Sequence, residues 1–189
     1  MKKIAILASG SGTNAERITK YFAYHPEIKV DVILSNRADA YVLERALKLG
    51  VDSGVFTREE LKNPAGVARN LQQRGADLVV LAGFLWLIPD ALLEAFPGRI
   101  INIHPALLPA YGGKNMYGMR VHEAVLAAGE KESGITIHYV DEIYDHGKII
   151  FQARCPVKKG DTPDQLAGRI HELEYKHYPE EIEKLLQGW

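Results

Sequence analysis

An asparagine and a histidine lie two residues apart at the end of an apolar run, in the sequence I-I-N-I-H-P of residues 100–105. Side chains alternate between the two faces of a strand, so Asn102 and His104 should point the same way. Pro105 lacks a backbone donor and restricts the residue before it, which predicts that the strand ends there with both side chains at its carboxyl edge. Ligands bind at that edge of open α/β sheets, where an imidazole could act as an acid or a base. A buried structural histidine beside a hydrogen-bonded asparagine fits these residues about equally well.

A glycine-rich loop, S-G-S-G-T-N-A over residues 9–15, follows the first apolar run and precedes a helical pattern. Backbone N–H groups and a helix N-terminus in that arrangement favour an anion such as phosphate. Gly10, Gly12 and Ala15 also satisfy the dinucleotide fingerprint G-x-G-x-x-G/A. The acid expected to bind ribose after the second strand is replaced by S-N-R at residues 35–37, which suits a 2′-phosphate or no dinucleotide. A small phosphate ester, NADP and a tight turn without a ligand all remain open.

The composition favours a globular protein that binds small molecules. The chain has 189 residues, of which 47% are hydrophobic, and its 23 basic residues nearly balance 24 acidic ones. These numbers predict one domain and no general affinity for nucleic acid or an anionic membrane. No apolar run is long enough to span a bilayer, the N-terminus resembles a strand rather than a signal sequence, and Cys155 is the single cysteine. We therefore expect a cytoplasmic protein without disulfides.

Seven histidines invite a metal hypothesis, but their spacing does not support one. His104, His122, His138 and His146 form no H-E-x-x-H motif or Cys/His cluster, so no metal is expected. His122 and His138 are expected to be structural, or to support residues that contact the ligand.

Apolar runs of strand length alternate with helical patterns, which is typical of βαβ units around a mostly parallel sheet. Strands are expected over residues 3–8, 30–34, 54–56, 77–82 and 100–103. Helices are expected over residues 14–24, 40–49, 58–74 and 89–95. Residues 109–119 have no periodicity and predict a long loop, which in a compact domain is usually functional or mobile.

The remaining third of the chain changes character. Residues 134–140 alternate apolar and polar with period two, which predicts a half-solvated antiparallel strand, and a further strand is expected over 148–157. Helical patterns cover residues 120–128 and 164–186, the second with a possible break at Pro179. The predicted class is α/β, with a mostly parallel sheet, antiparallel C-terminal strands and helices on both faces.

Five motifs together closely resemble the phosphoribosylglycinamide formyltransferases: S-G-S-G-T-N, S-N-R-A-D-A, L-A-G-F, N-I-H-P-A-L-L-P and D-x-G-K-I-I. The similarity extends from Ile4 to about Glu174. It implies one Rossmann-like formyltransferase domain over residues 1–189, with a phosphate-binding half over about 1–100 and a folate-binding and catalytic half over about 101–189. The N-x-H-P and L-L-P motifs are specific to enzymes that use formyltetrahydrofolate.

The resemblance implies transfer of a formyl group from the co-substrate 10-formyltetrahydrofolate to the amine of glycinamide ribonucleotide, in purine biosynthesis, without a metal or a covalent intermediate. It also implies that Asn102, His104 and Asp145 are catalytic. Attack of an amine on a formyl carbonyl creates an oxyanion and an ammonium, which Asn102 and a protonated His104 could stabilise. Asp145 would supply the negative charge that keeps His104 protonated.

Asp141 is a rival for the role of Asp145. Relatives usually place one apolar residue between Asp-Glu and the catalytic aspartate, whereas Ile143 and Tyr144 both intervene here. Gly147 and the two isoleucines after it align behind Asp145, which favours Asp145. Asp145 also suits an ordinary turn before a glycine.

The resemblance also implies two binding sites. The residues implied for glycinamide ribonucleotide are Gly12, Thr13 and Asn14 at its phosphate or ribose, and Glu174 at its amine. The residues implied for folate are Arg58, Leu85, Trp86, Leu87, Ile88, Asn102 and Asp141. Arg58 would lie near the glutamate tail, and the backbone from Asp141 would read the pteridine edge. Trp86 replaces an arginine common in relatives, so an ion pair made there is expected to be missing.

Residues 111–119 form a longer loop than in many relatives, which predicts either a mobile lid at the site or a simple surface excursion. Other functions remain possible from the sequence. A tRNA formyltransferase would need a further basic domain, and a formyltetrahydrofolate hydrolase an additional N-terminal domain. An NADP-dependent oxidoreductase would use the loop from Gly10 to Ala15. The expected partners are small molecules, with the chain a monomer or a homodimer.

Overall fold

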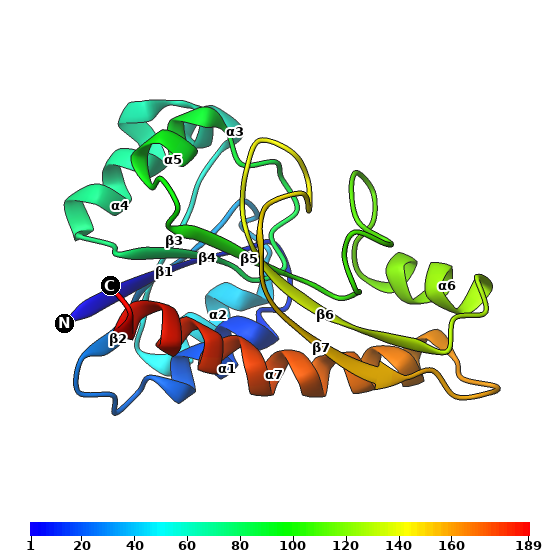
Figure 1. Cartoon of the computed structure of the whole chain (residues 1–189). Helices are drawn as coiled ribbons and strands as arrows, with labels where there is room; N and C mark the ends of the chain where they lie inside the picture. The colour runs from blue at the N-terminus through cyan, green and yellow to red at the C-terminus, as the bar shows by residue number, and fades with distance from the viewer.

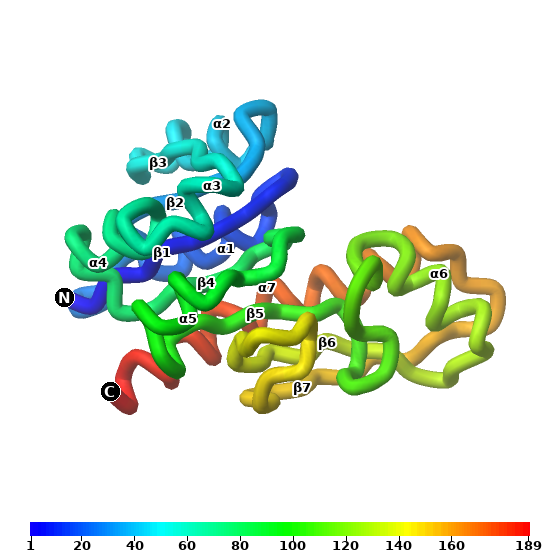
Figure 2. Tube along the Cα trace, turned by 90° about the horizontal axis from the view of Figure 1, so that it is seen from above, coloured from blue at the N-terminus to red at the C-terminus, as the bar shows by residue number.

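The computed structural model describes residues 1–189. Its centre is one seven-stranded sheet with the strand order β3-β2-β1-β4-β5-β6-β7 (Figures 1 and 2). The strands from β3 to β5 are parallel, and β6 and β7 are each antiparallel to the strand before them. The strands are β1 (Lys2–Ala8), β2 (Ile28–Ser35), β3 (Asp52–Val55), β4 (Leu78–Leu81), β5 (Ile100–His104), β6 (Glu132–Tyr139) and β7 (Ile149–Pro156). The predicted fold class is confirmed.

Helices cover both faces of this sheet (Figure 1). They are α1 (Thr13–Tyr21), α2 (Tyr41–Leu49), α3 (Arg58–Lys62), α4 (Arg69–Arg74), α5 (Asp90–Ala95), α6 (Met119–Ala127) and α7 (Pro163–Gln187). One face carries α1, α2 and α7, and the other carries α3, α4 and α5 (Figure 1). None of the helices is both long and apolar enough to cross a membrane.

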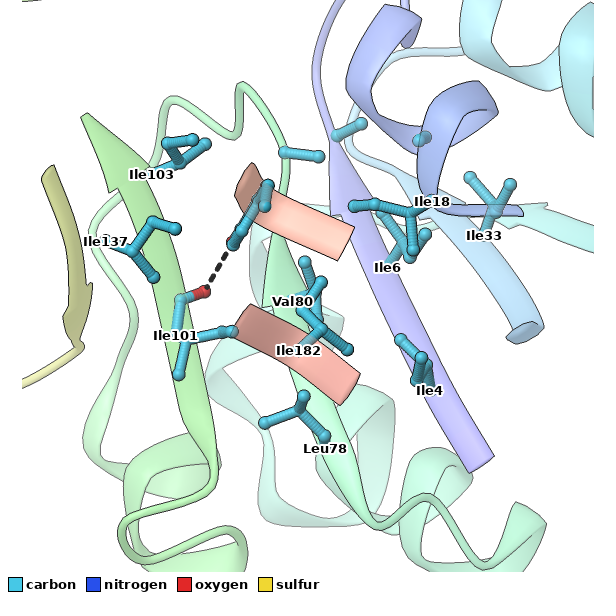
Figure 3. Close-up of a cluster of buried hydrophobic side chains, with 14 of the residues drawn as sticks. Ile4, Ile6, Ile18, Ile33, Leu78, Val80, Ile101, Ile103, Ile137 and Ile182 are labelled. Atoms are coloured by element: carbon cyan, nitrogen blue, oxygen red, sulfur yellow. Dashed lines mark hydrogen bonds between the residues drawn. The ribbon is translucent and has the colours of Figure 1, made fainter. Parts of the chain in front are cut away.

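Strand β1 shows why the sheet is covered twice. Ile4 and Ile6 belong to the hydrophobic cluster beneath α1 and α7, whereas Ala5 and Leu7 belong to the cluster beneath α3, α4 and α5. Successive side chains of a strand point to opposite faces, so a run without polar residues needs a layer of helices on each side. Figure 3 shows the first cluster, where Ile182 of α7 lies over the side chains of the central strands.

The single helix predicted over residues 58–74 is wrong. Three pieces occupy this stretch: α3, a π-helical turn η1 (Pro64–Ala68) and α4. Pro64 has no N–H to continue the helix, and Gly66 has non-helical dihedral angles, φ −90° and ψ −118°. Thr57 begins α3 with a capping box, in which its hydroxyl accepts from the N–H of Glu60.

Helix α7 continues through Pro179 without the break that the sequence allows. Proline removes one backbone donor, but the residues around it are packed into the core: Tyr178 and Ile182 are both fully buried. Thr162 forms a capping box with Gln165, and Pro163 follows at the first helical position, where a missing N–H costs nothing. The helix thus begins one residue before the predicted start.

The phenol of Tyr178 should contribute measurably to stability. Its hydroxyl donates to the carbonyl of Leu81, at 2.9 Å, and lies 3.4 Å from that of Ile101. Replacing Tyr178 with Phe leaves these buried acceptors without that donor, and we expect a loss of about 1–2 kcal/mol in the free energy of unfolding. Urea denaturation measures it, with Tyr24→Phe as the control because Tyr24 is fully exposed. Equal stability of the two variants would contradict the prediction.

Candidate active site

A cavity of about 520 Å³ opens at the carboxyl ends of β1, β4 and β5. Its lining includes the glycine loop before α1, the segment between β4 and α5, the end of β5, the β6–β7 loop and one face of α7. This is the edge at which α/β sheets bind ligands, and the volume is typical of small-molecule sites. Residues 113–118 of the predicted loop also line the cavity, so the loop lies at the site.

The structure brings the three predicted catalytic side chains together at the end of β5. His104 is 3% exposed, and its Nδ1 lies 3.4 Å from Oδ2 of Asp145. Nδ2 of Asn102 lies 3.5 Å from Oδ1 of the same carboxylate, a long hydrogen bond. Asp141 instead pairs with the exposed His146, at 2.9 Å, and with the N–H of Ile143. The geometry thus places Asp145, rather than Asp141, beside Asn102 and His104.

The β6–β7 loop reaches this position through tight backbone packing. Asp145 adopts left-handed dihedral angles with φ +55°, which few residues other than glycine do. Two residues later, a Cβ on Gly147 would lie only 1.8 Å from the carbonyl oxygen of Tyr139, so only glycine fits. Oδ2 of Asp145 accepts a hydrogen bond from the N–H of Gly113, at 2.9 Å.

The environment lowers the pKa values of both Asp145 and His104. Burial would raise the pKa of Asp145, but the neighbouring imidazoles of His138 and His104 and the N–H of Gly113 lower it, so the pKa lies below its usual value. Burial lowers the pKa of His104, and the opposing effects of Asp145 and the Tyr111 carbonyl do not compensate. Burial therefore opposes the protonated His104 that the resemblance implied, because desolvation of the imidazolium outweighs the attraction of Asp145.

His138 contacts Asn102, which corresponds to the second of its two expected roles, support of a residue at the site. Its Nδ1 faces the carbonyl of Tyr139, at 2.8 Å, so Nδ1 carries the hydrogen and Nε2 accepts from Nδ2 of Asn102, at 3.2 Å. The same Nε2 lies 3.7 Å from Asp145. The period-two pattern of residues 134–140 was the sequence signal for the position of His138. Only the strand register, in which His138 lies opposite Asn102, shows that the two side chains meet.

The predicted ribonucleotide residues meet across the cavity. Gly12 immediately precedes α1, and Thr13 and Asn14 are the first residues of that helix. Nδ2 of Asn14 donates to Oε2 of Glu174, at 3.0 Å, which joins the glycine loop to α7. The other amide atom, Oδ1 of Asn14, is buried without a partner.

Glu174 is buried, not on a solvated helix face. It is 6% exposed, and burial raises its pKa to about 7, while the bond from Asn14 acts in the opposite direction. His171 lies one turn earlier on the same face of α7 and also lines the cavity. His171 was not among the predicted site residues. Its spacing of three residues from Glu174 on a helix would have placed it on the same face.

The predicted folate residues divide between two adjoining pockets. Leu85, Trp86, Leu87, Ile88 and Asp141 line the main cavity. Arg58 does not: it lies in a smaller pocket of about 280 Å³ that shares Trp86, Leu87 and Ile88 with the main one. The guanidinium of Arg58 lies 4.7 Å from the ring centroid of Trp86, a cation–π contact. No three histidine, cysteine or acidic side chains are grouped to hold a metal ion.

Residues 2–182 match the family described as formyl transferase. The chain belongs to this family. The formyl transferase is similar to phosphoribosylglycinamide formyltransferase of Bacillus subtilis (39% identity, 98% of this chain and 95% of the relative). It is also similar to the chloroplastic enzyme of that name from Arabidopsis thaliana (42% identity, 96% of this chain). The chain spans 64% of the length of that plant relative and 61% of the one from Vigna unguiculata.

Solved structures agree with the family assignment. Glycinamide ribonucleotide transformylase 1 from Symbiobacterium toebii has a TM-score of 0.90 at 41% identity, covering 100% of this formyl transferase and 89% of that chain. Phosphoribosylglycinamide formyltransferase from Streptococcus pneumoniae TIGR4 has a TM-score of 0.86 at 41% identity, covering 98% and 99%. The likeness therefore extends over nearly the whole chain.

The buried Glu174 should make stability depend on pH. Its ordinary pKa of 4.5 is raised to about 7 in the folded protein, so the folded state holds the proton more tightly than the unfolded chain. Glu174 should therefore reduce the free energy of unfolding as the pH rises from about 4.5 to about 7. Glu174→Gln keeps an acceptor for Asn14 and does not ionise, so it should gain up to roughly 3 kcal/mol relative to the wild type between pH 4 and pH 8. Urea denaturation at both pH values tests this, and a difference independent of pH would contradict it.

Proposed function

We propose that this formyl transferase moves a formyl group from 10-formyltetrahydrofolate to the amine of glycinamide ribonucleotide, giving formylglycinamide ribonucleotide and tetrahydrofolate in purine biosynthesis. The observation that carries the proposal is the contact of Asp145 with both Asn102 and His104, inside a cavity that also holds the glycine loop. Relatives and solved structures with that enzyme name support it over nearly the whole chain.

The chemistry follows from the groups at the end of β5. The amine nitrogen attacks the formyl carbon, a C–N bond forms, and the carbonyl π electrons move to oxygen. Nδ2 of Asn102 carries two hydrogens, and one of them bonds to His138. The other faces Asp145 across a long contact and is available to the oxyanion. The new negative charge adds to that of Asp145 and raises the pKa of His104, so His104 becomes a favourable proton acceptor as the tetrahedral species forms. The ammonium loses a proton, N10 of the folate gains one, and cleavage of the bond between carbon and N10 releases tetrahydrofolate.

Each substrate has a matching part of the cavity. Gly12, Thr13 and Asn14 present backbone donors and a helix N-terminus to the phosphate or ribose of the ribonucleotide. We assign Glu174 to its amine, because a carboxyl with a pKa of about 7 exchanges protons with an ammonium group near neutral pH.

The apolar side of the cavity suits a flat heteroaromatic ligand. We place the pteridine between the wall of residues 85–88 and the backbone at Asp141, and the glutamate tail toward Arg58 in the adjoining pocket. The ring of Trp86 makes a cation–π contact with the guanidinium of Arg58.

We further propose that residues 1–189 act as one catalytic domain, as a monomer or a homodimer in the cytoplasm. Its partners are then the two small-molecule substrates, without nucleic acid or membrane. The continuous sheet supports one unit, because β4 and β5 of the two halves are directly paired.

The decisive assay mixes the purified protein with 10-formyltetrahydrofolate and glycinamide ribonucleotide and follows tetrahydrofolate release. We expect release only when both substrates are present, since the site is built to activate an amine. Turnover with water alone would indicate a hydrolase, and no turnover with the ribonucleotide would reject the proposal. NADPH fluorescence should not change on titration, and a saturable change would favour an oxidoreductase.

A matched pair of variants tests the catalytic carboxylate. Asp145→Asn removes the charge that faces His104 and should lower kcat by about 10²–10⁴-fold. Asp141→Asn changes a partly exposed carboxylate that pairs with His146, and its loss should be much smaller. Circular dichroism checks that both variants remain folded. A larger loss for Asp141→Asn would transfer the role to Asp141.

A further inference from the structure

The hydrogen bonds of His104 define which of its ring nitrogens can take up a proton. Nε2 lies 2.7 Å from the carbonyl oxygen of Tyr111, and Nδ1 lies 3.4 Å from Asp145. A carbonyl oxygen only accepts, so Nε2 carries the hydrogen. The neutral imidazole therefore has its free electron pair on Nδ1, toward Asp145, and Nδ1 is the atom that titrates.

The carbonyl of Tyr111 points at His104 because this residue is left-handed, with φ +57°. That conformation is unfavourable for tyrosine and persists only where the surroundings impose it. Two contacts of the side chain do so. The ring packs against the core cluster beneath α7, and the hydroxyl donates to Oε1 of Glu130, at 2.7 Å, just beyond the end of α6.

The next two residues connect the same segment to Asp145. A Cβ on Gly112 would lie 2.5 Å from Cδ2 of Leu108 and 3.2 Å from Cβ of Asp145, so the backbone passes directly beside the carboxylate residue. Gly113 then donates its N–H to Oδ2 of Asp145. One short stretch thus contacts both partners of the pair, one through a carbonyl and the other through an N–H.

We propose that Tyr111 is a positioning residue for formyl transfer, which holds the His104 imidazole in the Nε2–H tautomer through its carbonyl, and that the hydrogen bond from its phenol to Glu130 keeps this carbonyl in place. The proposal rests on the proposed function, because it assigns His104 a part in catalysis. Neither Tyr111 nor Glu130 needs to touch a substrate.

The test compares Tyr111→Phe and Glu130→Ala with Glu130→Gln, which keeps an oxygen acceptor. Nitrogen-15 NMR of labelled histidine side chains, above the pKa of His104, reports the tautomer, and His104→Asn identifies the signals. We expect the wild type to show the Nε2–H form. The first two variants should show averaging of the two tautomers and a kcat lowered about tenfold, with KM values within about twofold. Glu130→Gln should behave as the wild type, and Tyr24→Phe is the control for loss of an exposed phenol.

The outcomes separate the two proposals. An unchanged tautomer in both Tyr111→Phe and Glu130→Ala overturns the positioning role, whatever happens to kcat. A changed tautomer with unchanged kcat overturns it as well, because the tautomer would then not matter for the reaction. If the wild type lacks formyl transfer, the proposed function fails, while the NMR signals still show whether Tyr111 orients His104. Glu130→Ala lies at the surface, so the test does not depend on Tyr111→Phe remaining folded.

Discussion

The buried carboxylate of Asp145 is the contact on which the geometry of the site depends, because it joins four segments that are distant in the sequence. Asn102 and His104 approach it from β5, His138 from β6, and the N–H of Gly113 from the long loop. A carboxylate removed from water is costly unless donors compensate it. The N–H of Gly113 and the amide of Asn102 are its donors, and the imidazoles of His104 and His138 lie beside it. Once the carboxylate is satisfied in this way, the β6–β7 loop, the end of β5 and the long loop are held in one arrangement.

The left-handed residues at the site follow from the same constraint. Asp145 and Tyr111 both adopt conformations that cost free energy for residues with a Cβ. Each is held by tertiary contacts rather than by local preference: Asp145 by the N–H of Gly113 and the amide of Asn102, Tyr111 by Glu130 and the core. The stability of the sheet and its helices offsets this local strain, which is the usual relation between a scaffold and a preorganised site.

Helix α7 makes the two sides of the cavity one structure. It packs against α1 and α6 and against strands β6 and β7, so it touches both the parallel and the antiparallel part of the sheet. Tyr178 bonds to the end of β4, and Glu174 bonds to Asn14 of the glycine loop. The glycine-loop side of the cavity is therefore coupled to the same helix that stabilises the core, and burial in that core raises the pKa of Glu174 to about 7.

The amino-acid sequence by itself determined the class of fold, the strands that carry the site, and the identity of Asn102, His104 and the glycine loop. These follow from periodicity, from proline and glycine positions and from family motifs, which are local properties of the chain. The helix interruption near Gly66 has a local cause in Pro64 and Gly66, which the helical periodicity of the surrounding residues concealed. At Pro179 the helix is continuous because packing overrides the local preference for a break. Only the tertiary structure decided the partners of the catalytic pair, since the contacts of His104 with Asp145 and Tyr111, and of Asn102 with His138, depend on strand register and loop packing. It also decided that the pKa of His104 is lowered and that of Glu174 is raised, because desolvation depends on how deeply the whole fold buries a group.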